Sequence, residues 1–311
     1  MINERPSISV VIPVRNRPAL VVGTLRSVMA QTLQPRAVIV VDNGSDDDTA
    51  EAVRLAFRNW RTPGDQPVPE LKLVSEPVPG PSVARNRGLA EVDTEWTMFF
   101  DSDDEMLPRH IERAMAVAEQ NPDAEVVGWY VTHVDQEGRS SLKPFYSADS
   151  QYHNLFHASM ATQRYMARTE LFRRVGGWDD SLNIWEDIEI GARLIAQAPL
   201  IVKIAGLPTV VVRTNAESVT GPNYGSRFDL YEATLEAIAR TLPRRKRHWV
   251  AMKSAILAAD LARENDLRYA DVLRHVLADT PGLYHRMVLR LVFLYRRHGG
   301  RGAARLMRPF V

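Results

Sequence analysis

The stretch "ISVVIPV", residues 8–14, decides how the first half of the chain folds. It is short, apolar, rich in β-branched residues and closed by Pro13, which is typical of a strand buried on both faces of a parallel sheet. Apolar residues at helical spacing follow over residues 19–32, and "AVIVVDNGS" at 37–45 is a second strand of the same kind. A buried strand, a helix and another buried strand together predict a βαβ unit.

The same alternation continues through the first part of the chain. Ser82 is expected to cap one of the further helices, and Pro108 to lie in the first turn of another. The further strands are expected at 71–77 and 95–100, and the further helices at 49–60, 81–92 and 108–121. Repeated βαβ units predict a mostly parallel sheet with helices on both faces.

The pattern changes twice further along the chain. After residue 121 it is mixed, and from residue 227 it is helical only; strands are expected at 124–135 and 200–214, and helices at 185–198, 228–242, 247–264, 269–279 and 284–299. We therefore predict an α/β fold with a Rossmann-like, mostly parallel central sheet flanked by helices, and an all-helical C-terminal extension. The predicted domains are 1–226, with halves 1–121 and 122–226, and the extension 227–311.

Charge is distributed unevenly along the chain. The 311 residues carry a net charge of only +1, but residues 244–308 hold fifteen Lys or Arg against five Asp or Glu. This asymmetry marks a boundary near Pro243 and favours an anionic surface or partner for the tail. There is no cysteine, which excludes disulfides and thiolate metal sites. The start of the chain lacks a signal-peptide pattern and no long uncharged apolar run occurs, so a cytoplasmic protein is expected.

Acidic residues follow two of the expected strands. Asp42 ends the second strand, and Asp101 and Asp103 come directly after the strand at 95–100. Because ligands of open α/β sheets bind at the carboxyl ends of the strands, these side chains are expected at one edge. The D-x-D pair is either a solvated turn, a calcium loop, or a Mg²⁺ or Mn²⁺ site serving a phosphorylated substrate. Met106 stands where a calcium loop needs Gly, which disfavours the second.

Two further groups of residues have the same ambiguity. Glu186, Asp187 and Glu189 open the helix at 185–198, where carboxylates either offset the helix dipole or supply a general base. Arg85 lies on the helix after the Pro/Gly turn at 79–81, where it either is solvated or binds phosphate. No G-x-G-x-x-G or P-loop motif accompanies them, which disfavours dinucleotide oxidoreductases and P-loop enzymes.

Taken together, six segments resemble family 2 glycosyltransferases of the GT-A fold. They occur in the family's order and span about two thirds of the chain, from Pro6 to Thr220. The segments are "ISVVIPVRNRPALVVGTLRSVMAQT", "VIVVDNGSDDDT", "GPSVARNRGLA", "FFDSDD", "FRRVGGWDDSL" and "WEDIEIGARL". Under this resemblance residues 1–121 are the nucleotide-binding half of a GT-A domain and 122–226 its acceptor-binding half.

The resemblance also implies roles for single residues. Asp187 matches the family's catalytic base, with Glu186 beside it; Asp103 and Asp101 match the D-x-D motif that holds the metal. The positions implied for nucleotide-sugar binding are Pro13, Val14, Arg15, Asn16, Asp42, Asn43, Gly44, Arg85, Asp101 and Ser102. Those implied for acceptor binding are Trp178, Asp179 and Trp185. Two positions depart from the family: Arg15 stands where an aromatic residue is common, and Asn43 replaces a frequent second Asp.

The implied function is transfer of a sugar, with inversion, from a nucleotide-sugar to an acceptor nucleophile. UDP is the expected nucleotide, Mn²⁺ or Mg²⁺ the expected cofactor, and the acceptor is a glycan, a lipid-linked molecule, a small molecule or a peptide. The Q-x-x-R-W motif of processive synthases is absent, so single transfers are expected. The alternatives are a nucleotidyltransferase acting on sugar phosphates and a non-catalytic nucleotide-sugar-binding protein.

The basic extension leaves its own alternatives open. It is expected to be a helical cap on the transferase domain, with peripheral contact at the inner face of a membrane or self-association as rivals. Nucleic acid is not expected, because the basic bias comes without stacking-platform motifs. Acceptor specificity is expected in the loops at 146–163 and 215–227.

Overall fold

A seven-stranded sheet forms the centre of the protein, which we describe from a computed structural model covering residues 7–64, 66–214 and 223–303. Its strand order is β10-β6-β9-β4-β1-β2-β3. All neighbours pair in parallel except β9, which is antiparallel to both β4 and β6. The strands are β1 (Ile8–Val14), β2 (Ala37–Asp42), β3 (Glu70–Ser75), β4 (Trp96–Phe99), β6 (Val126–Gly128), β9 (Tyr165–Arg168) and β10 (Ile201–Lys203). The predicted mostly parallel α/β sheet is confirmed.

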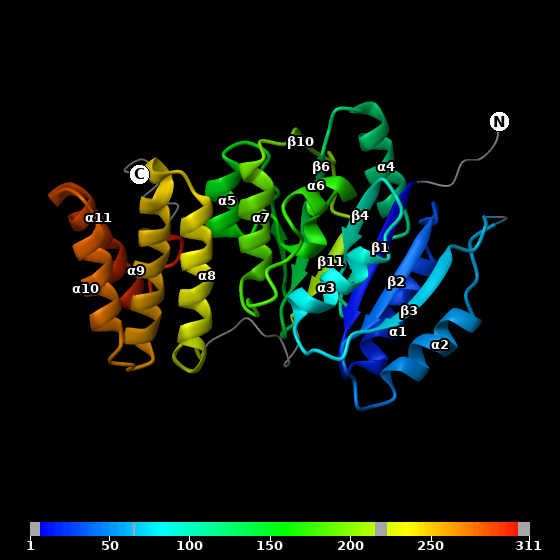
Figure 1. Cartoon of the computed structure of the whole chain (residues 1–311), viewed down its shortest axis with the longest axis horizontal. Helices are drawn as coiled ribbons and strands as arrows, with labels where there is room; N and C mark the ends of the chain where they lie inside the picture. Colours follow the sequence, from blue (N-terminus) through cyan, green and yellow to red (C-terminus); the bar gives the residue numbers. More distant parts are fainter. Residues whose placement is uncertain (1–6, 65, 215–222, 304–311) are drawn as a thin grey trace.

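Helices cover both faces of this sheet (Figure 1). They are α1 (Pro18–Met29), α2 (Thr49–Arg58), α3 (Pro81–Ala90), α4 (His110–Gln120), α6 (Thr169–Arg174) and α7 (Glu186–Ala196). Helix α5 (Ser150–His157) packs on α7 and on α9 (Arg247–Arg263) instead. Because side chains alternate along a strand, Val10 and Ile12 of β1 pack in one core with α1 and α4. Val11 packs in the other core, with α3, α6 and α7. The continuous apolar run in "ISVVIPV" is thus explained by burial on both sides.

Helix α3 packs unusually close to the strands. A Cβ atom at Gly88 would lie 2.3 Å from Cγ1 of Val11 and 3.1 Å from Cγ2 of Val41. Only glycine allows this approach, because real Cβ atoms do not come so near to other carbons. The close contact fixes the position of Arg85, one turn earlier on the same helix, relative to the sheet edge.

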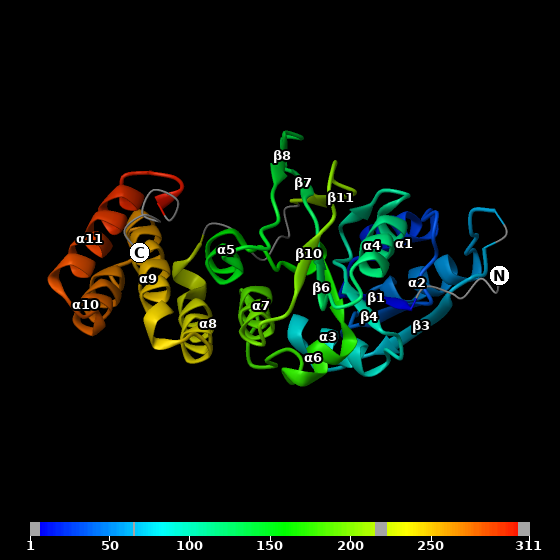
Figure 2. The ribbon, with the colours of Figure 1, turned by 90° about the horizontal axis from the view of Figure 1, so that it is seen from above.

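A second, four-stranded sheet stands near the middle of the molecule (Figure 2). Its order is β5-β11-β7-β8, with β11 parallel to β7 and antiparallel to β5. The strands are β5 (Glu105–Met106), β11 (Val210–Arg213), β7 (Val131–Val134) and β8 (Ser140–Lys143). This sheet ties the segment after the D-x-D motif to the second half of the chain.

Four helices follow at the end of the molecule opposite β3 and α2 (Figures 1 and 2). They are α8 (Phe228–Thr241), α9 (Arg247–Arg263), α10 (Tyr269–Asp279) and α11 (Leu283–Arg297), with short 3₁₀ turns before α8 and α9. Leu235 of α8 and Leu257 of α9 share an apolar core with Ile184 and Ile188 at the start of α7. In the ranges that the structure describes, no helix has the length and apolarity needed to cross a membrane.

The structure corrects several expected details. The strand predicted at 124–135 is two strands, β6 and β7, and that at 200–214 is likewise split into β10 and β11. Pro108 precedes α4, which begins at His110, so it does not lie in the first turn. Ser82 is not a cap: Gly80 holds the N-cap position, and the Ser82 hydroxyl donates to the Leu182 carbonyl at 2.8 Å.

Candidate active site

A cleft of about 1250 Å³ opens at the carboxyl edge of the large sheet. The second sheet, the segment 156–164 and the start of α7 supply its other walls, with Lys253 of the C-terminal helices, as expected of a ligand site in an α/β fold. Of the predicted site residues, those that line it are Pro13, Val14, Arg15, Asn43, Arg85, Asp101, Ser102, Asp103, Trp185, Glu186 and Asp187. The structure therefore brings together segments that lie up to about 170 residues apart in the sequence.

Arg85 joins two of the predicted motifs. Its guanidinium donates to Glu186 Oε1 at 2.9 Å and to Asp101 Oδ1 at 3.1 Å, and its side chain is only 7% exposed. Burial alone would lower the pKa of Arg85, but Asp101 and Glu186 raise it, so the group stays charged. A buried guanidinium shared by two carboxylates rigidly connects the D-x-D loop to the start of α7.

The Trp178 ring stacks against the Arg85 guanidinium. The Arg85 guanidinium lies 4.6 Å from the Trp178 ring, which also packs edge-on against Phe99. Trp178 is buried and Asp179 accepts two bonds from Ser181, at 3.0 and 2.6 Å. Neither is among the residues that line the cleft, so the structure places Trp178 in support of Arg85.

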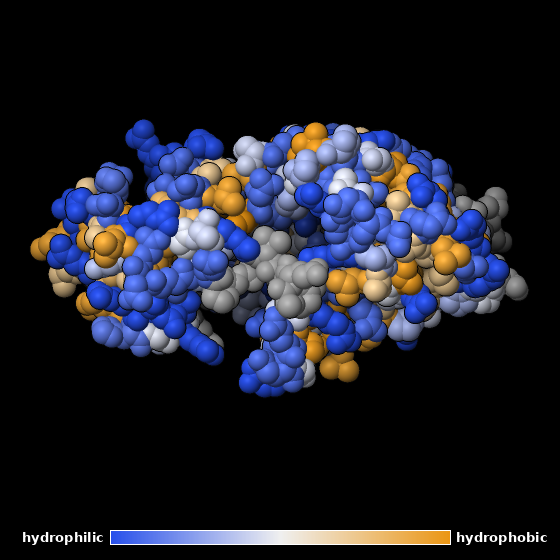
Figure 3. Space-filling view, turned by 90° about the horizontal axis from the view of Figure 1, so that it is seen from below, coloured by the Kyte–Doolittle hydropathy of each residue, from blue (hydrophilic) through white to orange (hydrophobic). Residues whose placement is uncertain are grey.

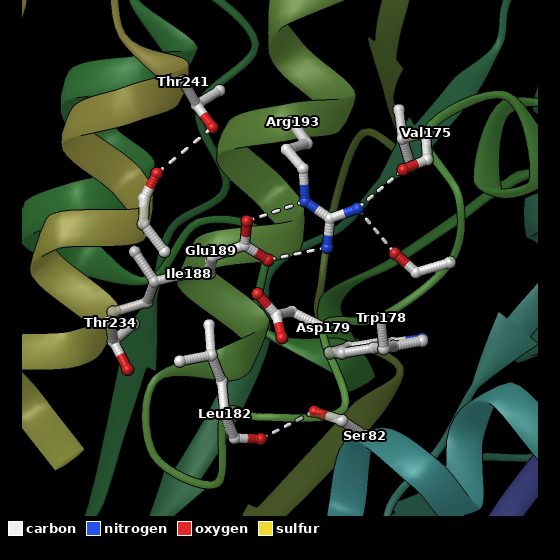
Figure 4. Close-up of polar contacts among 12 residues, drawn as sticks. Ser82, Val175, Trp178, Asp179, Leu182, Ile188, Glu189, Arg193, Thr234 and Thr241 are labelled. Carbon is white, nitrogen blue, oxygen red and sulfur yellow. Dashed lines mark hydrogen bonds and ion pairs between the residues drawn. The ribbon is translucent and has the colours of Figure 1, made fainter.

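Glu189 and Arg193 fix the loop that carries Trp178 (Figure 4). Arg193 makes a two-pronged ion pair with Glu189, with both nitrogen–oxygen distances at 2.7 Å. The same guanidinium donates to the carbonyls of Val175 and Gly177, at 2.8 and 2.6 Å. Glu189 thus has a structural role, because it connects α7 to the neighbouring loop through Arg193. This ion pair accounts for its position in the first turn without the helix dipole.

The acids of the D-x-D loop have separate partners. Asp101 pairs with Arg85, and Asp103 accepts from Arg17 Nη1 at 3.1 Å. Asp104 is buried and accepts the backbone N–H of Arg213 at 3.1 Å. Burial, together with Asp101 and Asp103, raises the pKa of Asp104 well above its usual range. Asp104 therefore anchors the loop to β11, and all three acids line the cleft.

The donor chemistry of Asp101 and Asp103 fits a magnesium or manganese ion that shares its coordination with a substrate diphosphate. Their carboxylates are hard oxygen ligands, and Mg²⁺ ordinarily takes one or two of these plus phosphate oxygens. Over residues 7–64, 66–214 and 223–303, no group of three or more His, Cys, Asp or Glu is arranged to hold a metal alone. Binding without the substrate is accordingly expected to be weak.

Asp187 lines the cleft and has a raised pKa. It stands in the first turn of α7. Trp185, the residue before this helix, has a left-handed backbone with φ 54°. Burial and the neighbouring Glu186 raise the pKa of Asp187 to about 7, although Arg85 and the Ile188 N–H oppose the rise. A carboxyl that titrates near neutral pH in a cleft has the property needed of a general base.

Comparison with known proteins decides the family. The model of "Glycosyl transferase family 2" matches residues 9–176, more than half of the chain. The chain belongs to glycosyl transferase family 2. The match includes the strands β1, β2 and β4, the D-x-D loop and Arg85, but stops before Asp187.

Relatives with curated descriptions are themselves glycosyltransferases. The uncharacterized glycosyltransferase YibD of Escherichia coli is 30% identical over 118 residues, which are 38% of this chain and 32% of that protein. The uncharacterized glycosyltransferase EpsJ of Bacillus subtilis is 25% identical over 72% of this chain and 66% of its own length. The match covers between 15% and 62% of the length of YibD and of four other curated relatives.

Two solved structures share the fold. TarS of Staphylococcus aureus superimposes with a TM-score of 0.68 at 18% identity, over 96% of this chain and 54% of that one. The mannosyltransferase PcManGT of Pyrobaculum calidifontis, in complex with GDP-Man and Mn²⁺, gives 0.56 at 19% identity, over 99% and 88%. Both support the GT-A fold, and the C-terminal helices are included in the matched length.

In this family 2 chain, several predicted nucleotide-side residues build loops and do not line the cleft. Asn16 has φ 52°; its N–H donates to Ser45 Oγ, and its side-chain oxygen accepts the N–H of Asp46. Asp42 accepts the N–H of Ser45 at 3.1 Å, and Gly44 takes φ +66° in the same loop. These contacts hold the loop after β1 against the loop after β2 at the carboxyl edge of the sheet.

Asn43 holds the next loop. Its side-chain NH₂ donates to the carbonyls of Glu76 and Val78, and its side-chain oxygen accepts the N–H of Gly80. All three contacts fall on the segment that leads from β3 into α3. Asn43 lines the cleft, and it also positions the helix that carries Arg85.

Sequence reasoning missed several residues that line the cleft of this family 2 chain. Lys253 reaches it from α9, and its ammonium lies 4.3 Å from the Trp185 ring. Burial lowers the pKa of Lys253 to about 8, although Asp187 and Asp260 raise it. Arg17 and Thr162 line it too, the latter 3.4 Å from Asp101. Arg17 adjoins the predicted first loop, but no local pattern marks Lys253, because its neighbours come from a different part of the chain.

Proposed function

We propose that this chain transfers a sugar, with inversion, from a nucleotide-sugar to an acceptor hydroxyl, with Asp187 as general base. The observation that carries the proposal is the Asp187 carboxyl, whose pKa is about 7, in the cleft wall beside the Arg85 ion-pair network. Family membership supports glycosyl transfer. UDP is the proposed nucleotide; a solved structure of TarS with a similar fold is in complex with UDP-GlcNAc, and PcManGT is in complex with GDP-Man.

In the proposed reaction Asp187 receives the proton of the acceptor hydroxyl. The acceptor oxygen forms a bond to the anomeric carbon from the face opposite the nucleotide, and the bond from that carbon to the diphosphate oxygen breaks. The nucleoside diphosphate leaves, and the configuration at the anomeric carbon is inverted. Proton removal of this kind is worth about 10²–10⁴-fold in rate. Burial keeps the pKa of Asp187 high, and the neighbouring Glu186 carboxylate adds to this rise.

Charge on the departing diphosphate is met by groups of this chain on the nucleotide side. Arg17 and Arg15 line the cleft there, close to the D-x-D loop. Asp103 and Asp101 would hold Mn²⁺ or Mg²⁺ together with the diphosphate oxygens. When bound, such a cation supplies Lewis-acid stabilisation of the negative charge that develops on the leaving group.

The acceptor side of the cleft is built from later parts of the chain. Residues of the predicted specificity loop 146–163 line it, as do Trp185 and Lys253. Of the other predicted specificity loop, 215–222 lie outside the described residues. The acceptor therefore meets a wall made jointly by the second half of the GT-A domain and by α9. We propose the division into 1–121, 122–226 and 227–311 on this basis.

Product analysis tests the proposed function. The purified chain is incubated with Mn²⁺ and a panel of UDP-, dTDP- and GDP-sugars, and release of nucleoside diphosphate is measured. With a sugar acceptor that supports turnover, nuclear magnetic resonance of the product reports the anomeric configuration. Inverted product supports the proposal. Retained configuration would contradict the proposed inversion. Release of inorganic diphosphate from a nucleoside triphosphate and a sugar phosphate would instead identify a nucleotidyltransferase, and donor binding without any turnover would identify a non-catalytic binding protein.

A further inference from the structure

Helix α11, the last long helix of the described residues, presents an apolar surface that the other described residues leave largely exposed. Large hydrophobic side chains that are exposed by more than a third number sixteen in the described chain, and six of them lie on this one helix. They are 42–73% exposed. They are Leu283, Tyr284, Met287, Leu291, Leu294 and Tyr295. Single exposed hydrophobics are normal on a protein surface, but a concentration of this kind marks an interaction site.

The three kinds of residue on α11 occupy separate arcs. At about 100° of turn per residue, the six exposed hydrophobics fall within an arc of about 120°. The buried residues Val288, Leu289, Val292 and Phe293 form a second arc, and the last three of them pack against α9. The exposed arginines Arg286, Arg290 and Arg297 lie between these two, along one border of the apolar arc. Thus α11 is anchored by one face and presents an apolar strip edged by positive charge.

The surroundings of α11 add to the positive charge. Residues 281–303 contain five arginines and no acidic residue. The His248 and His285 rings lie 6.2 Å apart, so the basic turn at 244–247 stands beside the start of α11. Three of its arginines, Arg244, Arg245 and Arg247, are exposed. Figure 3 shows hydrophobic and strongly hydrophilic residues next to one another at this end of the molecule.

We infer that the exposed arc of α11, which we call the α11 face (residues 283, 284, 287, 291, 294 and 295 with Arg286, Arg290 and Arg297), docks on an anionic phospholipid surface. An apolar strip edged by arginine is the pattern of a helix that lies flat in the interface, with its side chains in the acyl region and its charges at the headgroups. The site is separate from the cleft and does not depend on the proposed reaction.

Charge complementarity disfavours a second copy of this chain as the occupant. A symmetric contact through the α11 face would bring the two arginine borders toward each other, because both subunits use the same patch. No acidic residue of α11 is available to compensate them. An anionic phospholipid surface accommodates both parts of the face, because its acyl region takes the apolar strip and its headgroups pair with the arginines.

Vesicle sedimentation with the full chain tests the inference. The probe is extruded vesicles of phosphatidylcholine, with or without phosphatidylglycerol. Binding is expected only with the anionic lipid, and it should weaken when salt rises from 0.1 M to 1 M, where the screening length falls to about 3 Å. Equal binding to neutral vesicles, or none to anionic ones, would overturn the inference.

Two variants and their matched controls locate the binding on the α11 face. Arg286→Gln with Arg290→Gln and Arg297→Gln should weaken binding about 100-fold, at about fivefold for each charge near the membrane. Leu291→Ser with Leu294→Ser should weaken it at least about tenfold. The controls carry equal changes at exposed sites elsewhere, and they should bind like the natural chain. They are Arg26→Gln with Arg54→Gln and Arg58→Gln, and Leu55→Ser with Leu207→Ser.

Sedimentation velocity without lipid completes the test. All variants alter exposed side chains, so an unchanged thermal unfolding curve shows that they are folded. If the natural chain forms dimers that Leu291→Ser with Leu294→Ser abolishes, and anionic vesicles are not bound, a second copy occupies the face and the inference is wrong. Transfer activity is not a readout in any arm, so failure here leaves the proposed function untouched.

Discussion

Asp187 is where stability and chemistry oppose each other most directly. Its pKa of about 7 means that the fold binds its proton more tightly than the unfolded chain does. The folded state is therefore penalised as pH rises from about 4, where the unfolded group ionises, through 7. Above pH 7 the protein bears the full cost of a desolvated carboxylate, which is the form that a general base requires.

Asp187→Asn should abolish transfer and leave donor binding intact. The amide cannot accept the acceptor's proton, but it has nearly the same shape. The variant should also be roughly 1–3 kcal/mol more stable than the natural chain at pH 8, with the gain gone below about pH 4. Calorimetric titration with the donor and urea unfolding at both pH values check this. Loss of donor binding in parallel with transfer would contradict the assignment of Asp187 as base.

Asp103 allows a test of the metal that does not rely on turnover. Asp103→Ala should remove the dependence of donor binding on Mn²⁺, since this carboxylate is the proposed ligand next to Arg17. Calorimetry with UDP-sugar, with and without Mn²⁺, measures it. Asp104→Asn serves as the comparison, because Asp104 is buried and bonded to β11. Metal dependence that persists in Asp103→Ala would show that the cation is held elsewhere.

Lys253 should shape the pH profile of transfer. Its positive charge favours the ionised form of Asp187, so Lys253→Met is expected to move the acidic limb, near pH 7 in the natural chain, to higher pH. The fall expected above about pH 8 from loss of its own proton should disappear. Lys246→Met, which removes an ammonium 5.1 Å from the Trp249 ring, is the control. A uniform loss of rate at every pH would indicate a packing role only.

At the scale of single elements, α3 depends on Gly88. Gly88→Ala forces a methyl group into Val11 and should cost about 1–3 kcal/mol, while displacing Arg85 enough to weaken donor binding. Gly23→Ala, in α1, meets nothing within 4 Å and should stabilise by about 0.5–1 kcal/mol. Chemical denaturation of the two variants measures both changes in the free energy of unfolding, which should have opposite signs. Equal effects of the two changes would disprove the close contact between α3 and the sheet.

The elements that sequence predicted well are those with strong periodicity. β1 has the bounds predicted for it, and α2, α3 and α10 begin where expected. A strand buried on both faces gives a continuous apolar run, and a helix with one apolar face gives a repeat of about 3.6 residues, so both leave a clear pattern in the sequence. β5, β8, β9, α5 and α6 were missed, because each is a short element whose place is set by contacts across the fold. β9 is an example: its Ala167 pairs with both Thr97 and Val126, which no local signal reveals.

The candidate site shows the same division. The D-x-D loop, Arg85 and the start of α7 could be predicted to matter, since their residues match family motifs. That Arg85 would bridge Asp101 and Glu186 required the fold, because these residues lie on three separate elements. Trp178 was predicted to bind the acceptor. Its contact with Arg85 could not be predicted from the sequence, because the two residues lie far apart along the chain.

At the scale of the molecule, the C-terminal helices share a core with α7, the helix that carries Asp187. Leu235→Ala should cost about 2–5 kcal/mol, since Leu235 is buried with Ile184 and Ile188. Because that core spans α7 and α8, transfer should fall too, and circular dichroism and tryptophan fluorescence should report one common unfolding transition. Leu230→Ala, exposed on the same helix, should change neither. Two separate transitions would show that the extension unfolds on its own.

The side chain of Asn43 restricts how this pocket can evolve. Two of its contacts need a donor, toward the carbonyls of Glu76 and Val78, and one needs an acceptor, toward the N–H of Gly80. Aspartate in its place would set a carboxylate against two carbonyl oxygens, with no hydrogen to offer either. A lineage that exchanges Asn for Asp here must therefore remodel residues 76–80 in the same step, so position 43 and that loop are inherited as one unit.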